Sequence, residues 1–241
     1  MEEEEDKRGA KKRIFDAAVA LFARKGFAAV GIREIAKSAD VNVSMINYYF
    51  GGKVGILKAI INDCYDKYFH AIFDTGDEKT TPGERVRLLV RNLVQFFKTY
   101  TELSVAAFNT FLVDIPEIVD LRIKWLSGNR EATNRILTQF GLNTDDTVQM
   151  SVVQGVLTSI IATHFQGRYA WEYVMQAPDQ SKSSREYIKK EPRVELDEPF
   201  CDRYAEMLSN FYLSGLRSIV ARTPKILGRA ARGKKEKGRA K

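Results

Sequence analysis

Apolar residues recur at helical spacing along most of the chain, separated by short breaks that contain glycine, proline or polar residues. Near the N-terminus this pattern predicts a helix from Lys7 to Arg24, whose apolar positions share one face and which stops before Gly26. Shorter helices are expected over residues 32–38 and 43–49, and a long one over 53–74. Two short helices joined by a tight turn and stacked on a longer first helix are typical of a helix-turn-helix.

The remainder of the chain continues the helical pattern as a larger body. The low content of turn residues, six Pro and 16 Gly in 241 residues, argues against a β-sandwich or barrel. A Ser/Lys/Glu-rich stretch over residues 177–197 reads as a long polar loop. The body helices are expected over residues 82–100, 101–113, 116–140, 145–169 and 199–220.

These elements predict an all-α fold with three parts. Residues 1–52 form an N-terminal three-helix helix-turn-helix DNA-binding domain with an acidic extension at its start. Residues 53–221 form a C-terminal helical domain, to which the family resemblance given below assigns ligand binding and dimerisation. Residues 222–241 lack apolar periodicity and are expected to be a basic, disordered tail.

Charge is distributed unevenly along the chain. Residues 1–6 carry a net charge of −5, residues 7–58 carry +8, residues 59–221 carry −4 and residues 222–241 carry +8, for a total of +7. Basic segments attract polyanions, and nucleic acid is the commonest such partner inside a cell. Charge alone leaves a second interpretation open, in which both basic segments are only solvated surface.

Composition also narrows the expected location. Two cysteines cannot form a disulfide framework, and no run approaches 18 apolar residues. The first residues, MEEEED, are the opposite of a secretory signal. We therefore expect a soluble intracellular protein that does not enter a membrane.

Residues 31–57, GIREIAKSADVNVSMINYYFGGKVGIL, closely resemble the DNA-binding domain of the TetR family of bacterial transcriptional regulators. The matching features are Arg33-Glu34-Ile35-Ala36, the turn before Val41, and Ile46-x-Tyr48-Tyr49-Phe50-x-x-Lys53. The end of the preceding helix, Phe22-x-x-x-Gly26-Phe27, fits as well. The resemblance covers roughly residues 10–60 in motif, and the remainder only in length and helix count.

The resemblance implies which residues contact DNA. Arg33 suits a guanine edge, and Lys53 stands at a helix start, where the backbone amides favour an anion. By the family pattern, bases would be read by Arg33, Val43, Ser44 and Met45, and the DNA backbone would be held by Gly31, Asn47, Tyr48, Tyr49 and Lys53.

Three positions depart from the family pattern. Gly31 stands where a Thr is usual, so it offers only its backbone amide. Asp40 replaces the usual Gly of the turn and adopts a left-handed conformation less readily. Asn47 replaces a common Tyr, so one aromatic phosphate contact is lost or becomes an amide contact.

The resemblance also implies a ligand-responsive transcriptional regulator, usually a repressor, in the bacterial cytoplasm and nucleoid. It would bind a palindromic double-stranded DNA operator as a homodimer formed through the helices at 145–169 and 199–220, and a small apolar or amphipathic effector would release it. Most body aromatics are expected to be core, but some to line the effector pocket. The candidates are Phe97, Tyr100, Phe108, Phe111, Trp125, His164 and Phe165.

Other functions are weighed against this one. A non-specific or architectural DNA-binding protein would use the basic head and tail without a defined operator. An enzyme has little support, because no dinucleotide, P-loop, zincin or serine-hydrolase motif occurs and the two His are far apart. No cofactor and no metal are expected. The tail over 222–241 either adds non-specific DNA affinity or is only solvated.

Overall fold

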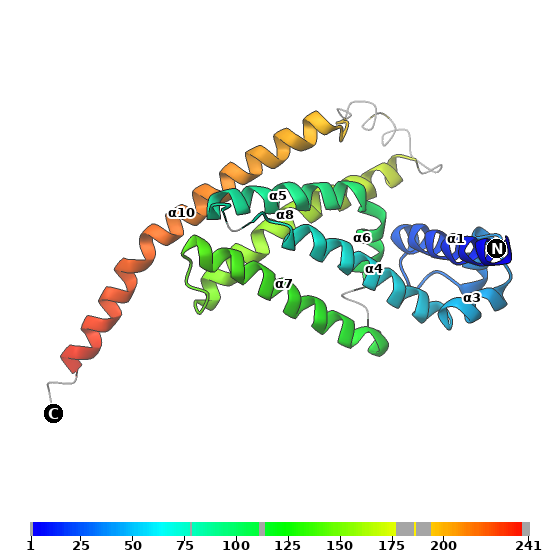
Figure 1. Cartoon of the computed structure of the whole chain (residues 1–241), viewed down its shortest axis with the longest axis horizontal. Coiled ribbons are helices and arrows are strands. Elements are labelled where there is room, and N and C mark those ends of the chain that lie inside the picture. The colour runs from blue at the N-terminus through cyan, green and yellow to red at the C-terminus, as the bar shows by residue number, and fades with distance from the viewer. Residues whose placement is uncertain (1, 78, 111–113, 177–185, 187–193, 238–241) are drawn as a thin grey trace.

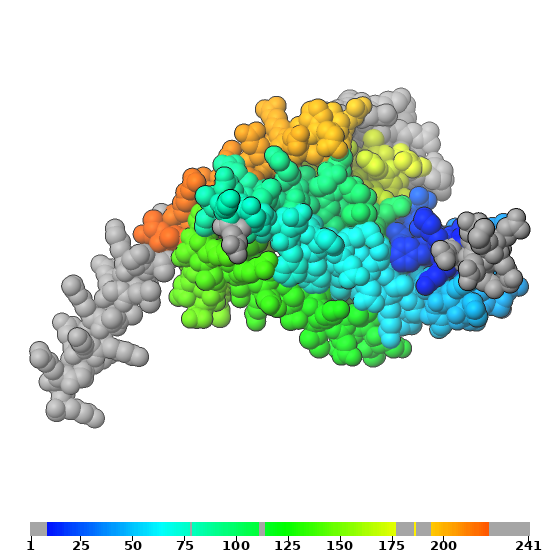
Figure 2. All heavy atoms as spheres, in the orientation of Figure 1, coloured from blue at the N-terminus to red at the C-terminus, as the bar shows by residue number. Residues whose placement is uncertain are grey.

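The computed structural model describes residues 2–77, 79–110, 114–176, 186 and 194–237, with side chains described from residue 9 to residue 221. In these ranges every regular element is a helix, as the sequence predicts. A small N-terminal head lies at one end of an elongated helical body, and the last helix projects from the opposite end (Figure 1). The space-filling view shows the head in blue joined to the body over a limited surface (Figure 2).

The head contains α1 (Glu2–Lys25), α2 (Ile32–Ser38) and α3 (Val43–Phe50), which are the three predicted helices. α1 begins earlier than expected, because the acidic residues at its start favour the positive end of the helix dipole. Apolar residues from successive turns of these three helices pack together in a common core. The fully buried members include Ile14, Ala18, Phe22, Ile35 and Ile46.

α4 (Lys53–Phe73) joins the head to the body. Its first half buries Ile56, Leu57, Ile60 and Ile61, of which Ile56 and Leu57 are 0% exposed. Its second half packs against the body helices described below. One rigid helix therefore contributes to both cores.

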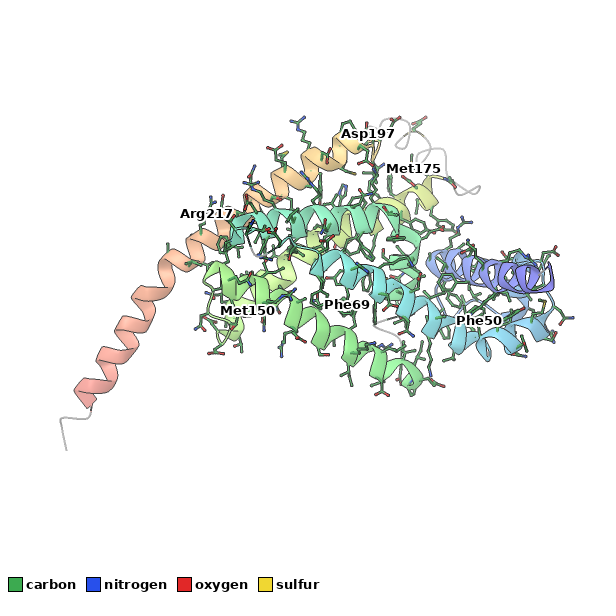
Figure 3. The ribbon with its side chains drawn as sticks, in the orientation of Figure 1. Phe50, Phe69, Met150, Met175, Asp197 and Arg217 are labelled. Carbon is green, nitrogen blue, oxygen red and sulfur yellow. The ribbon has the colours of Figure 1, made fainter. Side chains whose placement is uncertain are left out.

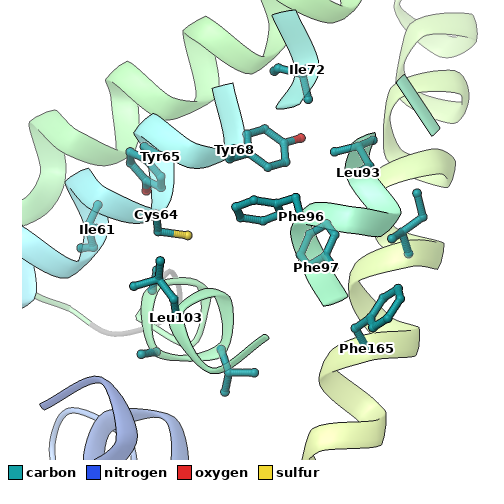
Figure 4. Packing of buried hydrophobic residues seen from close by; sticks show 14 of the residues in the cluster. Ile61, Cys64, Tyr65, Tyr68, Ile72, Leu93, Phe96, Phe97, Leu103 and Phe165 are labelled. Carbon is teal, nitrogen blue, oxygen red and sulfur yellow. The ribbon is translucent and has the colours of Figure 1, made fainter. Parts of the chain in front are cut away.

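The body begins with α5 (Pro82–Thr99), α6 (Thr101–Phe108) and, after a single 3-10 turn, α7 (Val119–Phe140). Thr81 and Glu84 form a reciprocal capping box at the start of α5, which explains why this helix begins at Pro82. The predicted apolar face of α5 is buried throughout, and Figure 4 shows Phe96 and Phe97 beside Tyr68 of α4.

Two long helices complete the body, α8 (Thr147–Met175) and α10 (Glu198–Lys237). Both are longer than the sequence predicts. The backbone of α10 continues over residues 222–237, a stretch expected from the sequence to be a disordered tail, and Lys, Arg and Ala of high helix propensity dominate it. Residues 238–241 and most of the predicted loop over 177–197 lie outside the described residues.

Candidate nucleic-acid interface

The turn between α2 and α3 is held by local hydrogen bonds. The Asn42 side-chain oxygen accepts hydrogen bonds from the backbone nitrogen and the hydroxyl of Ser44, both at 2.9 Å, so Asn42 is the N-cap of α3, a position that favours Asn. Asp40 has a φ of 51°. The turn thus takes a left-handed conformation at this position, although the residue is not glycine. Arg13 of α1 donates to the carbonyl oxygen of Ala39 at 3.2 Å and ties the turn to the first helix.

α3 buries one residue, and its other residues are either exposed or half-buried. Ile46 is completely buried in the head core, as its spacing predicts. Ser44, Asn47 and Tyr48 are exposed, and the Tyr48 side chain is 78% exposed. The ring and the hydroxyl of Tyr48 are therefore free to contact a partner.

The remaining predicted contact residues of α3 lie at the edge of this surface. Val43, Met45 and Tyr49 are half-buried and pack against the head core. The Tyr48 and Tyr49 rings meet edge to face with centroids 5.0 Å apart. This contact orients the two phenol groups relative to the helix.

Lys53 starts α4 next to the exposed face of α3. Its Nζ lies 4.2 Å from the centre of the Phe27 ring, and burial lowers the pKa of Lys53 from its ordinary value of 10.5. Gly52 precedes it without a side-chain cap, so the first backbone amides of α4 are open to an acceptor. A cation beside free helix-start amides is a suitable site for a phosphate group.

α2 contributes the other predicted contacts. Gly31 is the N-cap of α2 and has no side-chain capping bond, which agrees with its expected role through the backbone alone. Arg33 is exposed and forms no ion pair with the described residues. The neighbouring Glu34 is 2.6 Å from the Lys25 ammonium group, which raises the pKa of Lys25 and lowers that of Glu34. The nine predicted DNA-contact residues thus lie at the start of α2, on α3 and at the start of α4.

Sequence reasoning missed one residue that positions this surface. Gly55 lies in the first turn of α4, where a Cβ would overlap the carbonyl oxygen of Phe50 and lie 2.7 Å from its carbonyl carbon. The end of α3 therefore rests directly on the backbone of α4. Figure 3 labels Phe50 at this corner of the head. An isolated glycine inside an apolar helix is the sequence signal that marks such an approach.

The predicted effector-pocket residues fall into two aromatic clusters. Phe97 and Phe108 have ring centroids 6.2 Å apart, and Phe108 lies 5.5 Å from Trp125. Tyr100 joins this first cluster through Phe96.

The second cluster lies between α8 and α10. The His164 ring stacks on Tyr204 at 4.8 Å and on Phe200 at 5.9 Å, and Phe165 contacts Tyr204 edge-on. Burial, and secondarily the Arg168 charge, lower the pKa of His164. Phe111 lies outside the described residues.

Three of the cavities formed by the described residues are lined by residues other than the seven predicted pocket residues. One of about 530 Å³ lies between α5 and α10, and one of about 790 Å³ lies beside α7. A third, of about 240 Å³, lies between the head and the body. The described side chains form no group of three metal-ligating residues.

The arrangement of α2, the tight turn and α3 against α1 is that of a helix-turn-helix protein. Residues 14–60 match the model of the bacterial regulatory proteins of the tetR family. Over 118 residues, or 48% of this chain, the sequence is 31% identical to a probable HTH-type transcriptional regulator, YttP, of Bacillus subtilis. That alignment spans 57% of the relative's own length, so the chain matches little more than half of it.

Solved structures share the whole fold. A TetR-like transcriptional regulator from Rhodococcus sp. RHA1 superposes with a TM-score of 0.63 at 17% identity, over 86% of this chain and 96% of that one. The regulator FadR from Bacillus subtilis, in complex with stearoyl-CoA, superposes with a TM-score of 0.57 at 17% identity, over 85% and 98%. Residues 14–60 thus carry the match to the tetR-family model, and the solved structures extend the similarity to the fold of most of the chain.

Proposed function

We propose that this protein is a ligand-responsive transcriptional repressor that binds a palindromic operator as a homodimer and is released by a small-molecule effector. The observation that carries the proposal is the exposed face of α3, formed by Ser44, Asn47 and Tyr48, with Arg33 before this helix in the sequence and Lys53 after it. A helix that buries one residue and exposes polar and aromatic side chains suits the major groove.

The proposed dimer rests on an apolar stripe that the single chain leaves open. On α8, Val148, Val152, Val156 and Ile160 follow one another at intervals of four residues and are 37–73% exposed. This stripe runs along a single face of the helix, and isolated apolar residues would not be so aligned. A Cβ built at Gly155 on the same face meets no atom within 4 Å.

α10 also exposes a pair of large apolar side chains. Met207 and Phe211 are one turn apart and 63% and 68% exposed. Two apolar faces on adjacent long helices suit a four-helix interface with a second copy of the chain. By length and composition α8 is also the one described helix apolar enough to cross a membrane, a test that interface and core helices pass as well.

Effector control would act through α4. The Lys53 end of this helix supports the corner of the head, and its Tyr68 packs against Phe96 and Phe108 in the first aromatic cluster of the body. A ligand that binds two arrangements of the body unequally would move α4 and alter the distance between the two heads. That FadR binds an acyl-CoA supports an amphipathic effector here.

The test is selection of bound fragments from a random pool of duplex DNA at physiological salt. Enrichment of an inverted repeat is the expected result, because two symmetric heads read two half-sites about 34–36 Å or a multiple of that apart. Clear binding without enrichment would refute the proposal and favour a non-specific, architectural DNA-binding protein.

A further inference from the structure

The cavity between the head and the body differs from the predicted effector pocket, since it shares no residue with it. Its wall comes from three helices that are distant in the sequence. Ala23 and Arg24 come from the end of α1, Val105 from α6, and a longer stretch from the last turns of α8. In Figure 1 the C-terminal end of α8 lies on the side of the body that faces the head.

The cavity has the composition of a small-molecule site. Apolar and aromatic groups make up most of the wall, with Tyr169 and Tyr173 as the large members. Only a few polar groups converge on such a lining, and this combination is usual for ligand pockets. The volume, about 240 Å³, is below that of drug-sized sites, but an apolar cavity of about 150 Å³ already holds a benzene ring.

Two polar groups in the wall favour an acceptor in the ligand. Gln166 lines the cavity, and its buried Nε2 donates no hydrogen bond to the described residues. A buried amide without a partner is costly, so an acceptor placed there would be bound favourably. Arg24 brings a positive charge to the same wall.

The ion pair that Arg24 forms with Glu102 is weak. The guanidinium is 3.7 Å from Glu102 of α6, beyond the length of a good hydrogen bond. Glu102 also accepts a 2.9 Å hydrogen bond from the Tyr169 hydroxyl, and burial together with Glu102 raises the pKa of Tyr169 to about 12. Tyr169 therefore stays a neutral donor and satisfies Glu102 when Arg24 turns toward another anion.

We propose that this cavity binds a small carboxylate with a monocyclic aromatic or short aliphatic body. The carboxylate would accept from the Gln166 amide and pair with Arg24, while the apolar part would lie against Tyr169 and Ala170. The ligand would bridge α1 of the head and α8 of the body, and so would hold the head relative to the rest of the molecule. This regulatory consequence rests on the proposed function, whereas the binding itself does not.

The test is a titration of the full chain with 4-fluorobenzoate, followed by ¹⁹F NMR. Saturable binding is expected. Ala170→Phe should fill the cavity and abolish it, and Ala170 is exposed at the surface, so the larger side chain leaves the core intact. Gln166→Leu should weaken binding about tenfold by removing one hydrogen bond.

The matched control is Gln154→Leu, also on α8, whose amide donates to Asn134 at 2.7 Å beside a different cavity. It should leave the affinity unchanged. The neutral probe 4-fluorobenzamide should bind about tenfold more weakly than 4-fluorobenzoate because it lacks the charge that pairs with Arg24. The proposed site would be overturned if 4-fluorobenzoate showed no saturable binding, or if Ala170→Phe bound it as tightly as the unsubstituted chain does. The proposed ligand class would be overturned if 4-fluorobenzamide bound as tightly as 4-fluorobenzoate.

The two proposals fail separately. Loss of operator selection in the DNA experiment, with 4-fluorobenzoate still bound, would remove the proposed function and leave the site. Operator selection without 4-fluorobenzoate binding would remove the proposed site and leave the proposed function. If both hold, 4-fluorobenzoate and DNA should change each other's affinity by the same factor, since linkage is reciprocal.

Discussion

Replacing Gly55 by alanine tests whether the contact between α3 and α4 positions the DNA-binding surface. The added methyl group would overlap the Phe50 carbonyl oxygen, which is backbone and cannot rotate away as a side chain can. Relief requires a shift of the end of α3 relative to α4. Tyr48, Tyr49 and Lys53 all lie within this corner, so the shift would move three predicted DNA contacts at once.

The expected magnitude combines two opposing effects. Alanine is better than glycine in a helix by about 0.8–1 kcal/mol. Overpacking against a rigid group costs typically about 1–3 kcal/mol and sometimes more. Because the overlap is with backbone, we expect a net loss of about 2 kcal/mol in the free energy of unfolding, or roughly 4–8 °C in the melting temperature of a chain of this size.

The assays are thermal unfolding by circular dichroism and DNA affinity by fluorescence anisotropy. Gly55→Ala should melt earlier and bind selected DNA about tenfold or more weakly, as a displacement of contact groups predicts. The control is Gly83→Ala in the first turn of α5, where a Cβ meets no atom within 4 Å. It should raise stability by about 0.5–1 kcal/mol and leave DNA affinity unchanged. A Gly55→Ala protein with native melting temperature and native DNA affinity would refute the reasoning.

Four other outcomes are expected. Val152→Asp should convert the proposed dimer to a monomer in light scattering, because it places a charge in the apolar stripe; a dimer that persists would exclude α8 from the interface. Arg33→Ala should cost about 1–3 kcal/mol of discrimination at one base pair, and a uniform loss over all sequences would instead assign Arg33 to phosphate. The folded pKa of His164 lies below its ordinary 6.5, so folding stability should fall as the pH drops through and below 6.5, and His164→Gln should lack this part of the slope in urea titrations at several pH values. Deleting residues 224–241 should weaken binding to all DNA alike and flatten the salt dependence, whereas an unchanged slope would show that the tail makes no phosphate contacts.

The sequence by itself determined the helices and the head. Hydrophobic periodicity, the Asn42 cap and the glycine breaks place α2, α3 and α4 within a residue or so of their ends, because these signals are local. The motif around Tyr48 and Lys53 likewise predicts the DNA-contact residues, and of these the structure exposes Ser44, Asn47 and Tyr48 on α3. The extent of α10 was underestimated, since the residues after 221 lack apolar periodicity although many of them favour helix.

Only the tertiary structure decided what depends on distance between segments. The pocket candidates share an aromatic character, but the partition of the six described ones into clusters around Phe108 and around His164 follows from helix packing that no local pattern encodes. The same holds for the contact of Gly55 with Phe50 and for the cavity between the head and the body. Local spacing specifies which face of a helix is apolar, but which neighbour covers that face is settled only when the helices pack.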